Sequence, residues 1–190
     1  MQQLREQLLK LLNRFNDIVA NEISSNITLQ KQYPSIGRLC DIHPASCREH
    51  QIQSLFFHGL RKSRYYVHSE SLYFYPKSNS RRIDLAVWLG ILKRWLYLEL
   101  EPCTPLSGYI PVLTDAKKYI SDRTAHSCDK LKCLLVYGFR DQVNTDHFPR
   151  KYSRLSTDLA SLGYQEIAIK KKTLINDAYS YILSGLWLFK

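Results

Sequence analysis

Three acidic residues, Asp84, Glu99 and Glu101, occur in two neighbouring segments whose composition is typical of β-strands. A hairpin with a loop of two or four residues, centred between Ile91 and Leu92, pairs Asp84 with Glu99. Because side chains alternate between the faces of a strand, all three carboxylates then lie on one face. Crowded carboxylates repel each other unless a cation joins them, and oxygen ligands of this kind suit Mg²⁺ or Mn²⁺. The spacing therefore predicts a divalent-metal site.

The hydrophobic pattern of this hairpin specifies its register. One face is wholly aliphatic, so a slip by one residue would turn the acids into the core. In this register Arg82 lies across from Glu101. An ion-pair network that includes Arg82 and a nearby lysine is therefore the alternative to a metal site. The aliphatic face consists of Ile83, Leu85, Val87, Leu89, Leu96, Leu98 and Leu100.

The charge balance points to a polyanionic partner. The chain of 190 residues has 27 lysines and arginines against 17 aspartates and glutamates, a formal net charge of +10. Such an excess favours nucleic acid as the partner, because basic side chains neutralise backbone phosphates. The basic residues expected to contact nucleic acid are Arg61, Lys62, Arg64, Arg81, Arg82, Lys93 and Arg94. Nearby tyrosines that are candidates for stacking on bases, with ordinary packing as the alternative, are Tyr65, Tyr66, Tyr73 and Tyr75.

Several other classes of protein have no support in the sequence. The five cysteines include no Cys-x-x-Cys pair, which favours reduced thiols over a zinc site or a disulfide framework. No secretory leader and no apolar run of about 20 residues occurs, so we expect a cytoplasmic protein without a membrane segment. A glycine-rich phosphate loop and a Gly-x-Ser-x-Gly motif are also absent.

Length and composition favour a single domain that covers residues 1–190. Residues 1–24 contain an amphipathic helix whose apolar stripe we expect to face the core, with a dimer seam or a larger complex as the alternative. A second helix is expected from Ser46, which caps it together with Glu49, to about Lys62. Glu49 therefore has a structural role available even without chemistry.

The remaining elements predict a mixed α/β fold, with a central mixed sheet and helices on both sides. Residues 65–75 favour one bent strand or two strands, and the hairpin follows them. Gly163 is expected to end a helix as its C′ residue. The later elements are a helix over 108–123, a buried strand over 131–139, a helix over 150–162, a strand over 164–170, and a segment over 174–189 ambiguous between helix and strand.

This order over residues 46–139 resembles the PD-(D/E)XK nuclease superfamily, which has the restriction-endonuclease-like fold. The resemblance rests on a helix with an early Glu49, Glu70 before a strand, Ile-Asp-Leu around Asp84 and Leu-Glu-Leu-Glu around Glu99. It implies Mg²⁺-dependent hydrolysis of phosphodiester bonds in DNA. It also implies that Asp84 and Glu99 are metal ligands and that Glu49 assists them.

The chain departs from the family pattern at one position. Where the family usually has a lysine two residues after the strand acid, this chain has Glu101. Some members of the family also carry Glu there and remain nucleases, and Glu101 then acts as a further ligand or as a general base. Others supply the lysine from an adjacent helix, for which Lys117 and Lys118 are candidates, unless they are simply solvated. In still others the fold remains as an inactive nucleic-acid-binding or protein-interaction module, which is the alternative function here.

Overall fold

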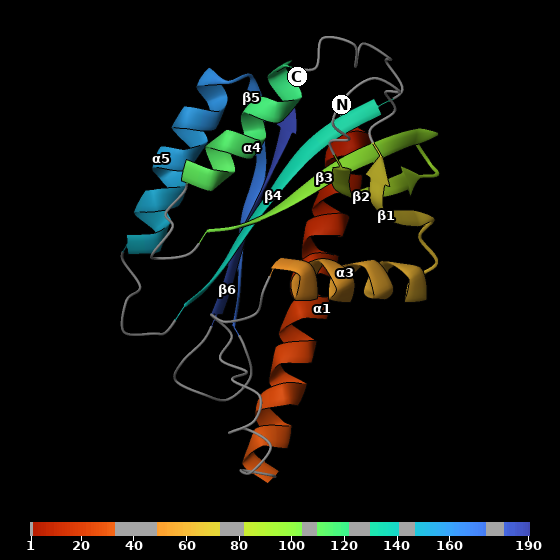
Figure 1. Cartoon of the computed structure of the whole chain (residues 1–190), viewed down its shortest axis with the longest axis vertical. Helices are drawn as coiled ribbons and strands as arrows, with labels where there is room; N and C mark the ends of the chain where they lie inside the picture. Colours follow the sequence, from red (N-terminus) through yellow and green to blue (C-terminus); the bar gives the residue numbers. More distant parts are fainter. Residues whose placement is uncertain are drawn as a thin grey trace.

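The computed structural model describes residues 2–32, 49–72, 82–103, 110–121, 130–140, 147–173 and 181–190. Its centre is a mixed six-stranded sheet with helices on both faces, as expected from the sequence (Figure 1). The helices are α1 (Gln2–Gln32), α3 (Glu49–Lys62), α4 (Ile110–Ser121) and α5 (His147–Ser161). The strands are β1 (Val67–Leu72), β2 (Arg82–Leu89), β3 (Arg94–Pro102), β4 (Lys130–Arg140), β5 (Tyr164–Thr173) and β6 (Tyr181–Phe189).

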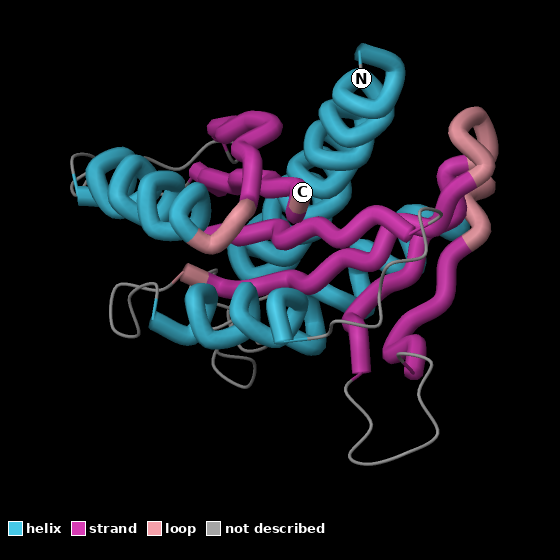
Figure 2. The backbone as a smooth tube through the Cα atoms, turned by 90° about the horizontal axis from the view of Figure 1, so that it is seen from above, coloured by secondary structure: helices cyan, strands magenta, loops and turns pink. Residues whose placement is uncertain are grey.

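The strands lie in the order β1-β2-β3-β4-β6-β5. Only β3 and β4 are parallel, and every other neighbouring pair is antiparallel. A parallel pair needs a crossover connection, and α4 lies in the chain between these two strands. Viewed from above, the strands form a twisted layer between the helices (Figure 2). The crossover therefore joins β3 and β4, the two strands at the middle of the sheet.

One hydrophobic cluster joins α1 and α3 to the sheet. Phe15 of α1 packs edge-on against Phe56 of α3, with ring centroids 5.1 Å apart, and against Tyr137 of β4 at 5.5 Å. The apolar stripe of α1 is fully buried here, so it serves as core packing in this chain. Burial of each such side chain contributes about 1.5–3 kcal/mol. The buried residues of this stripe are Leu8, Leu11, Leu12, Phe15 and Val19.

A second cluster joins α4 and α5 to the opposite face. Trp187 of β6 is fully buried in it, and its ring lies against Gly185, where a Cβ would be 2.2 Å from the nearest ring carbon. Two buried tyrosines tie the layers together. The hydroxyl of Tyr152 donates to the Leu183 carbonyl (3.1 Å), and that of Tyr164 donates to the Ala116 carbonyl (2.9 Å).

The central hairpin has the predicted register. Leu85 pairs with Leu98 and Trp88 with Trp95, and the loop has the four residues 90–93, with Lys93 at a φ of +50°. The expectation for Ile83 was wrong, because its side chain joins the second cluster with Ala86 and Tyr97 and leaves the aliphatic face. The pairing of β2 with β3 ends at Leu85–Leu98, whereas β1 still pairs with Ile83 and Arg82.

Other elements differ from expectation mainly in length. Helix α1 continues beyond residue 24 to Gln32. The Ser25 hydroxyl donates to the Asn21 carbonyl, so the hydroxyl is satisfied within the helix. Residues 181–189 are a strand, because β4 and β5 pair with both of its edges. Gly163 has a φ of +90° after α5 and is the C′ residue that was predicted. Ser46 lies outside the described residues. None of the described helices combines the length and apolarity needed to cross a membrane.

Candidate active site

Glu99 and Glu101 lie on the face of the sheet that α4 and α5 also cover, opposite the face of Leu98 and Leu100. Glu99 and Glu101 of β3 are 7% and 6% exposed, and Asp84 of β2 is half-buried. Burying a charged group is costly unless it is paired, hydrogen-bonded or bound to a cation. Their burial distinguishes these glutamates from the ordinary solvated carboxylates of a sheet surface.

Asp84 is held from two sides. The backbone N–H of Leu100 donates to its Oδ2 (2.7 Å), and the side-chain amide of Gln53 on α3 donates to its backbone carbonyl (3.0 Å). Gln53 is only 6% exposed, so this contact fixes α3 against β2 at the acid. Carboxylate oxygens such as those of Asp84, Glu99 and Glu101 are the type of ligand that a hard divalent ion takes.

Helix α3 is the element expected to bring Glu49 to the acids. Glu49 is the first residue of α3 and precedes Gln53 by one turn. The helix packs against β1, β2 and β3 within the first cluster, on the face opposite Glu99 and Glu101, and the side chain of Glu49 lies outside the described residues. Gln53 was missed in the sequence analysis.

A second residue missed by sequence reasoning is Lys132 on β4. It is only 6% exposed, and the parallel register pairs it with Tyr97, two residues from Glu99 on the same face. Its Nζ lies 5.8 Å from the ring centroid of Phe189 on β6. Lys132 is the only charged residue between Leu131 and Phe139. A lysine in such an apolar run is the sequence feature that could have marked it as a buried charge.

The predicted helix lysines differ in what is described of them. Lys117 has an exposed side chain next to Ala116, the buried residue by which α4 faces the sheet. This exposure agrees with a solvated helix face. The side chain of Lys118 lies outside the described residues.

The predicted basic residues gather at two places. Arg61, Lys62 and Arg64 lie at the end of α3 and in the turn after it, and Lys93 and Arg94 lie at the tip of the hairpin. All five side chains are exposed. Arg81 lies outside the described residues. The side chain of Arg82 does too, so its ion pair with Glu101 stays a prediction.

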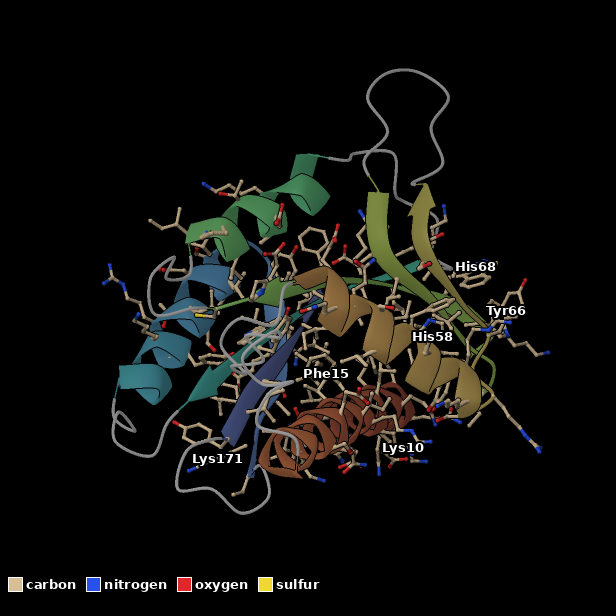
Figure 3. All side chains as sticks on the ribbon, turned by 60° about the horizontal axis from the view of Figure 1, so that its bottom comes forward. Lys10, Phe15, His58, Tyr66, His68 and Lys171 are labelled. Carbon is tan, nitrogen blue, oxygen red and sulfur yellow. The ribbon has the colours of Figure 1, made fainter. Side chains whose placement is uncertain are left out.

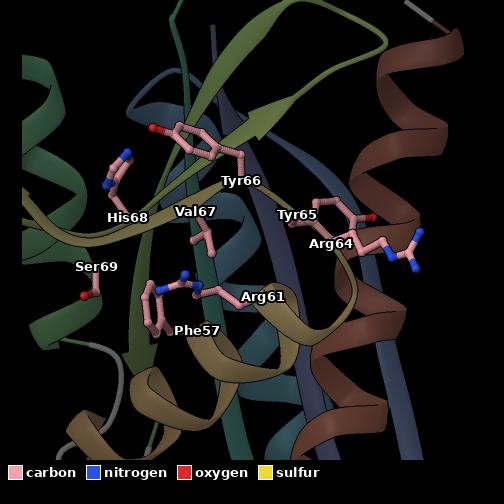
Figure 4. Close-up of a pocket in the computed structure, with 8 residues that line it drawn as sticks. All are labelled: Phe57, Arg61, Arg64, Tyr65, Tyr66, Val67, His68 and Ser69. Atoms are coloured by element: carbon pink, nitrogen blue, oxygen red, sulfur yellow. The ribbon is translucent and has the colours of Figure 1, made fainter.

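An open pocket of about 470 Å³ lies between the end of α3 and strand β1 (Figure 4). Arg61 extends across it above the Phe57 ring, with the guanidinium carbon 5.8 Å from the ring centroid. Strand β1 is an edge strand, so the pocket opens along the margin of the sheet. Its lining consists of Phe57, Arg61, Arg64, Tyr65, Tyr66, Val67, His68 and Ser69.

Within the described residues, no group of three or more His, Cys, Asp or Glu side chains is arranged to hold a metal ion. The Mg²⁺ or Mn²⁺ site thus stays a prediction that rests on Asp84 and the two glutamates. No protein-family model, curated protein or solved structure matches this chain. The functional argument therefore rests on the geometry of these residues.

Proposed function

We propose that this protein is a metal-dependent nuclease of the PD-(D/E)XK type, acting on phosphodiester bonds of DNA. One observation carries the proposal. Two buried glutamates, Glu99 and Glu101, lie on β3 just beyond the point where its pairing with β2 ends at Leu85–Leu98, next to Asp84. In a chain of net charge +10, two acids held at buried positions of a central strand are the first candidates for chemistry.

The order of the elements supports the resemblance on which the proposal draws. Helix α3 is followed by the antiparallel strands β1, β2 and β3, then by α4 and by β4 parallel to β3. Asp84 and Glu99 thus occupy adjacent strands of the sheet, with α3 packed against both strands.

The proposed roles follow from the chemistry of phosphodiester hydrolysis. Asp84 and Glu99 are the residues that would hold Mg²⁺ or Mn²⁺, which when bound polarises a phosphate and lowers the pKa of a bound water. Glu101 accepts a proton from the attacking water or adds a ligand oxygen. Lys117 or Lys118 would balance the charge that develops on the phosphate.

A non-catalytic nucleic-acid-binding module is the second candidate. The observation in its favour is Glu101, which stands where the resemblance leads one to expect a lysine. Such a module would keep the basic residues Arg61, Arg64 and Arg94 as its working parts and would shift DNA without cutting it.

The test is incubation of the purified protein with plasmid and oligonucleotide DNA in Mg²⁺ or Mn²⁺. We expect cleavage by the wild type and its loss in Asp84→Asn and Glu99→Gln, with DNA binding retained. Glu22→Gln is the matched control, because Glu22 is exposed on α1. Binding without cleavage by the wild type selects the second candidate, and equal cleavage by all variants excludes Asp84 and Glu99 from the chemistry.

A further inference from the structure

Four aromatic rings gather at the hairpin end of the sheet. We call Tyr66, His68, Trp88 and Trp95 the aromatic platform. The Tyr66 ring lies 5.0 Å from that of His68 and 5.7 Å from that of Trp95, between centroids. His68 lies 5.8 Å from Trp95, and Trp88 lies 5.3 Å from Trp95. These contacts join three strands into one continuous aromatic surface.

The platform shares its face of the sheet with Glu99 and Glu101. The backbone N–H of Trp88 donates to the Tyr66 carbonyl (2.9 Å), and Trp88 pairs with Trp95 across the hairpin. Trp95 and Glu99 are four residues apart on β3, which is an even number and about 13 Å at the usual rise. A chain that lies across the rings and continues along the strands therefore reaches the acids within a few nucleotides.

The platform is open to solvent. Tyr66 is 60% exposed, His68 is exposed, and Trp88 and Trp95 are half-buried. On this face α4 packs against β3 and β4, and α5 against β5, so β1 and the hairpin tip extend beyond both helices (Figure 1). Figure 3 shows Tyr66 and His68 side by side at one end of the molecule. In contrast, Trp187 on the same sheet is fully buried.

Positive charge borders the platform on more than one side. Tyr66 and His68 also line the pocket that holds Arg61 and Arg64. Lys130 pairs with Trp95 across β3 and β4 and approaches the Tyr97 ring to 5.7 Å. Rings beside cations match the two parts of a nucleotide, because bases stack and phosphates are anionic.

We propose that the aromatic platform binds unpaired bases, so that the substrate of the acidic site is single-stranded nucleic acid or a single-stranded segment. Phosphates next to the stacked bases lie in the pocket against Arg61 and Arg64. Duplex bases are already stacked on one another and cannot lie on these rings, which is why the platform selects unpaired strands. The assignment of the substrate rests on the proposed nuclease function, whereas the binding of single strands does not.

The first test measures binding in EDTA, where no metal-dependent cleavage can occur. Fluorescence anisotropy compares labelled oligo(dT) and oligo(U) with a duplex of equal length. We expect the wild type to bind single strands more tightly than duplex. Tyr66→Ala weakens single-strand binding by about 5- to 150-fold, the range for losing one stacking ring, while Tyr66→Phe keeps it. The dT and U arms distinguish DNA from RNA.

Charge controls separate the platform from general attraction. Arg61→Gln removes one charge from the pocket, and Arg5→Gln removes one from an exposed position near the start of α1. We expect a clear loss of affinity only for Arg61→Gln. Equal binding of duplex and single strands, with Tyr66→Ala unaffected, would overturn the proposal, and so would selective capture of peptides over oligonucleotides.

A second readout distinguishes this inference from the nuclease proposal. Thermal melting of Tyr66→Ala shows whether the variant is folded, and Tyr66→Phe provides the comparison if it is not. Loss of single-strand binding in Tyr66→Ala without any Asp84-dependent cleavage keeps the platform and removes the nuclease. Cleavage that depends on Asp84 but is unchanged in Tyr66→Ala keeps the nuclease proposal and removes the platform.

Discussion

The side chain of Asp84 accepts the backbone N–H of Leu100 across the end of the β2–β3 pairing, with 2.7 Å between Oδ2 and the nitrogen. A carboxylate thus takes the hydrogen bond of a buried strand residue just where the backbone pairing stops at Leu85–Leu98. The contact satisfies a donor that would otherwise be orphaned, and it holds β3 beside Asp84. The same carboxylate is therefore both a structural acceptor and the first candidate ligand of the site.

This dual role predicts that two variants at Asp84 have different free energies of unfolding but both lose cleavage activity. Asp84→Ala leaves the buried Leu100 N–H without its acceptor and should lower the free energy of unfolding by about 1–3 kcal/mol. Asp84→Asn keeps an oxygen acceptor and should cost clearly less, while both variants lose cleavage. Urea denaturation measures the first difference. Equal destabilisation by the two variants would show that the hydrogen bond is not what the carboxylate contributes.

Gly59 marks the close approach of α3 to α1, and its replacement tests that packing. A Cβ at this position would lie 2.3 Å from Cδ1 of Ile18 and 2.7 Å from its Cγ1. Gly59→Ala gains about 1 kcal/mol in helix propensity, but the overpacking should cost more, giving a net loss of about 1–2 kcal/mol. Thermal or urea unfolding measures the outcome.

The control for Gly59 is on the same helix. Ser54→Ala alters an exposed position of α3 and should be neutral or slightly stabilising. Adding Ile18→Ala to Gly59→Ala should restore part of the loss, because the two side chains are in direct contact. A stabilised Gly59→Ala single variant would mean that the helices separate without cost.

Cys133 predicts a loss of stability in alkaline solution. Burial raises the pKa of this free, fully buried thiol well above its ordinary value of 9.0, because the thiolate would lose its hydration. In the unfolded chain the thiol releases its proton near pH 9, whereas the folded protein keeps it. The native state then binds more protons, so the free energy of unfolding falls as pH rises above 9, by at most about 1.4 kcal/mol per pH unit.

Urea denaturation at pH 8 and pH 10 checks this fall, with Cys133→Ala as the control that should show a smaller one. Tyr152, whose pKa burial also raises, adds to the effect only above pH 10. Thiol reagents should leave Cys133 unmodified until the protein unfolds. Identical pH dependence in the variant, or rapid labelling of native Cys133, would contradict the argument.

Much of the sheet was predictable because alternation in the hairpin is strong. The run from Leu85 to Leu89 faces Leu96 and Leu98 across a four-residue loop, and one register alone buries them together. Ile83 departed from that pattern at a position that pairs with β1 and no longer with β3. The aromatic platform was not predicted from the sequence for another reason. Residues 73–81 separate β1 from β2, so the sequence does not specify that Tyr66 meets Trp88.

Individual site residues were harder to find than the elements that carry them. Glu99 and Glu101 could be found because acids interrupt an aliphatic strand. Gln53 could not, since its bond is to the backbone of Asp84 and depends on how α3 packs. Lys132 was concealed in an apolar run, and its burial becomes visible only when β4 is placed between β3 and β6.

The central claim is that Asp84 and Glu99 hold one divalent ion in common. Crystals soaked in Mn²⁺ and measured at its absorption edge test this most directly. The account predicts one anomalous peak about 2.0–2.3 Å from a carboxylate oxygen of each residue, and its loss in Glu99→Gln crystals. A peak elsewhere, or an unchanged peak in the variant, would contradict it.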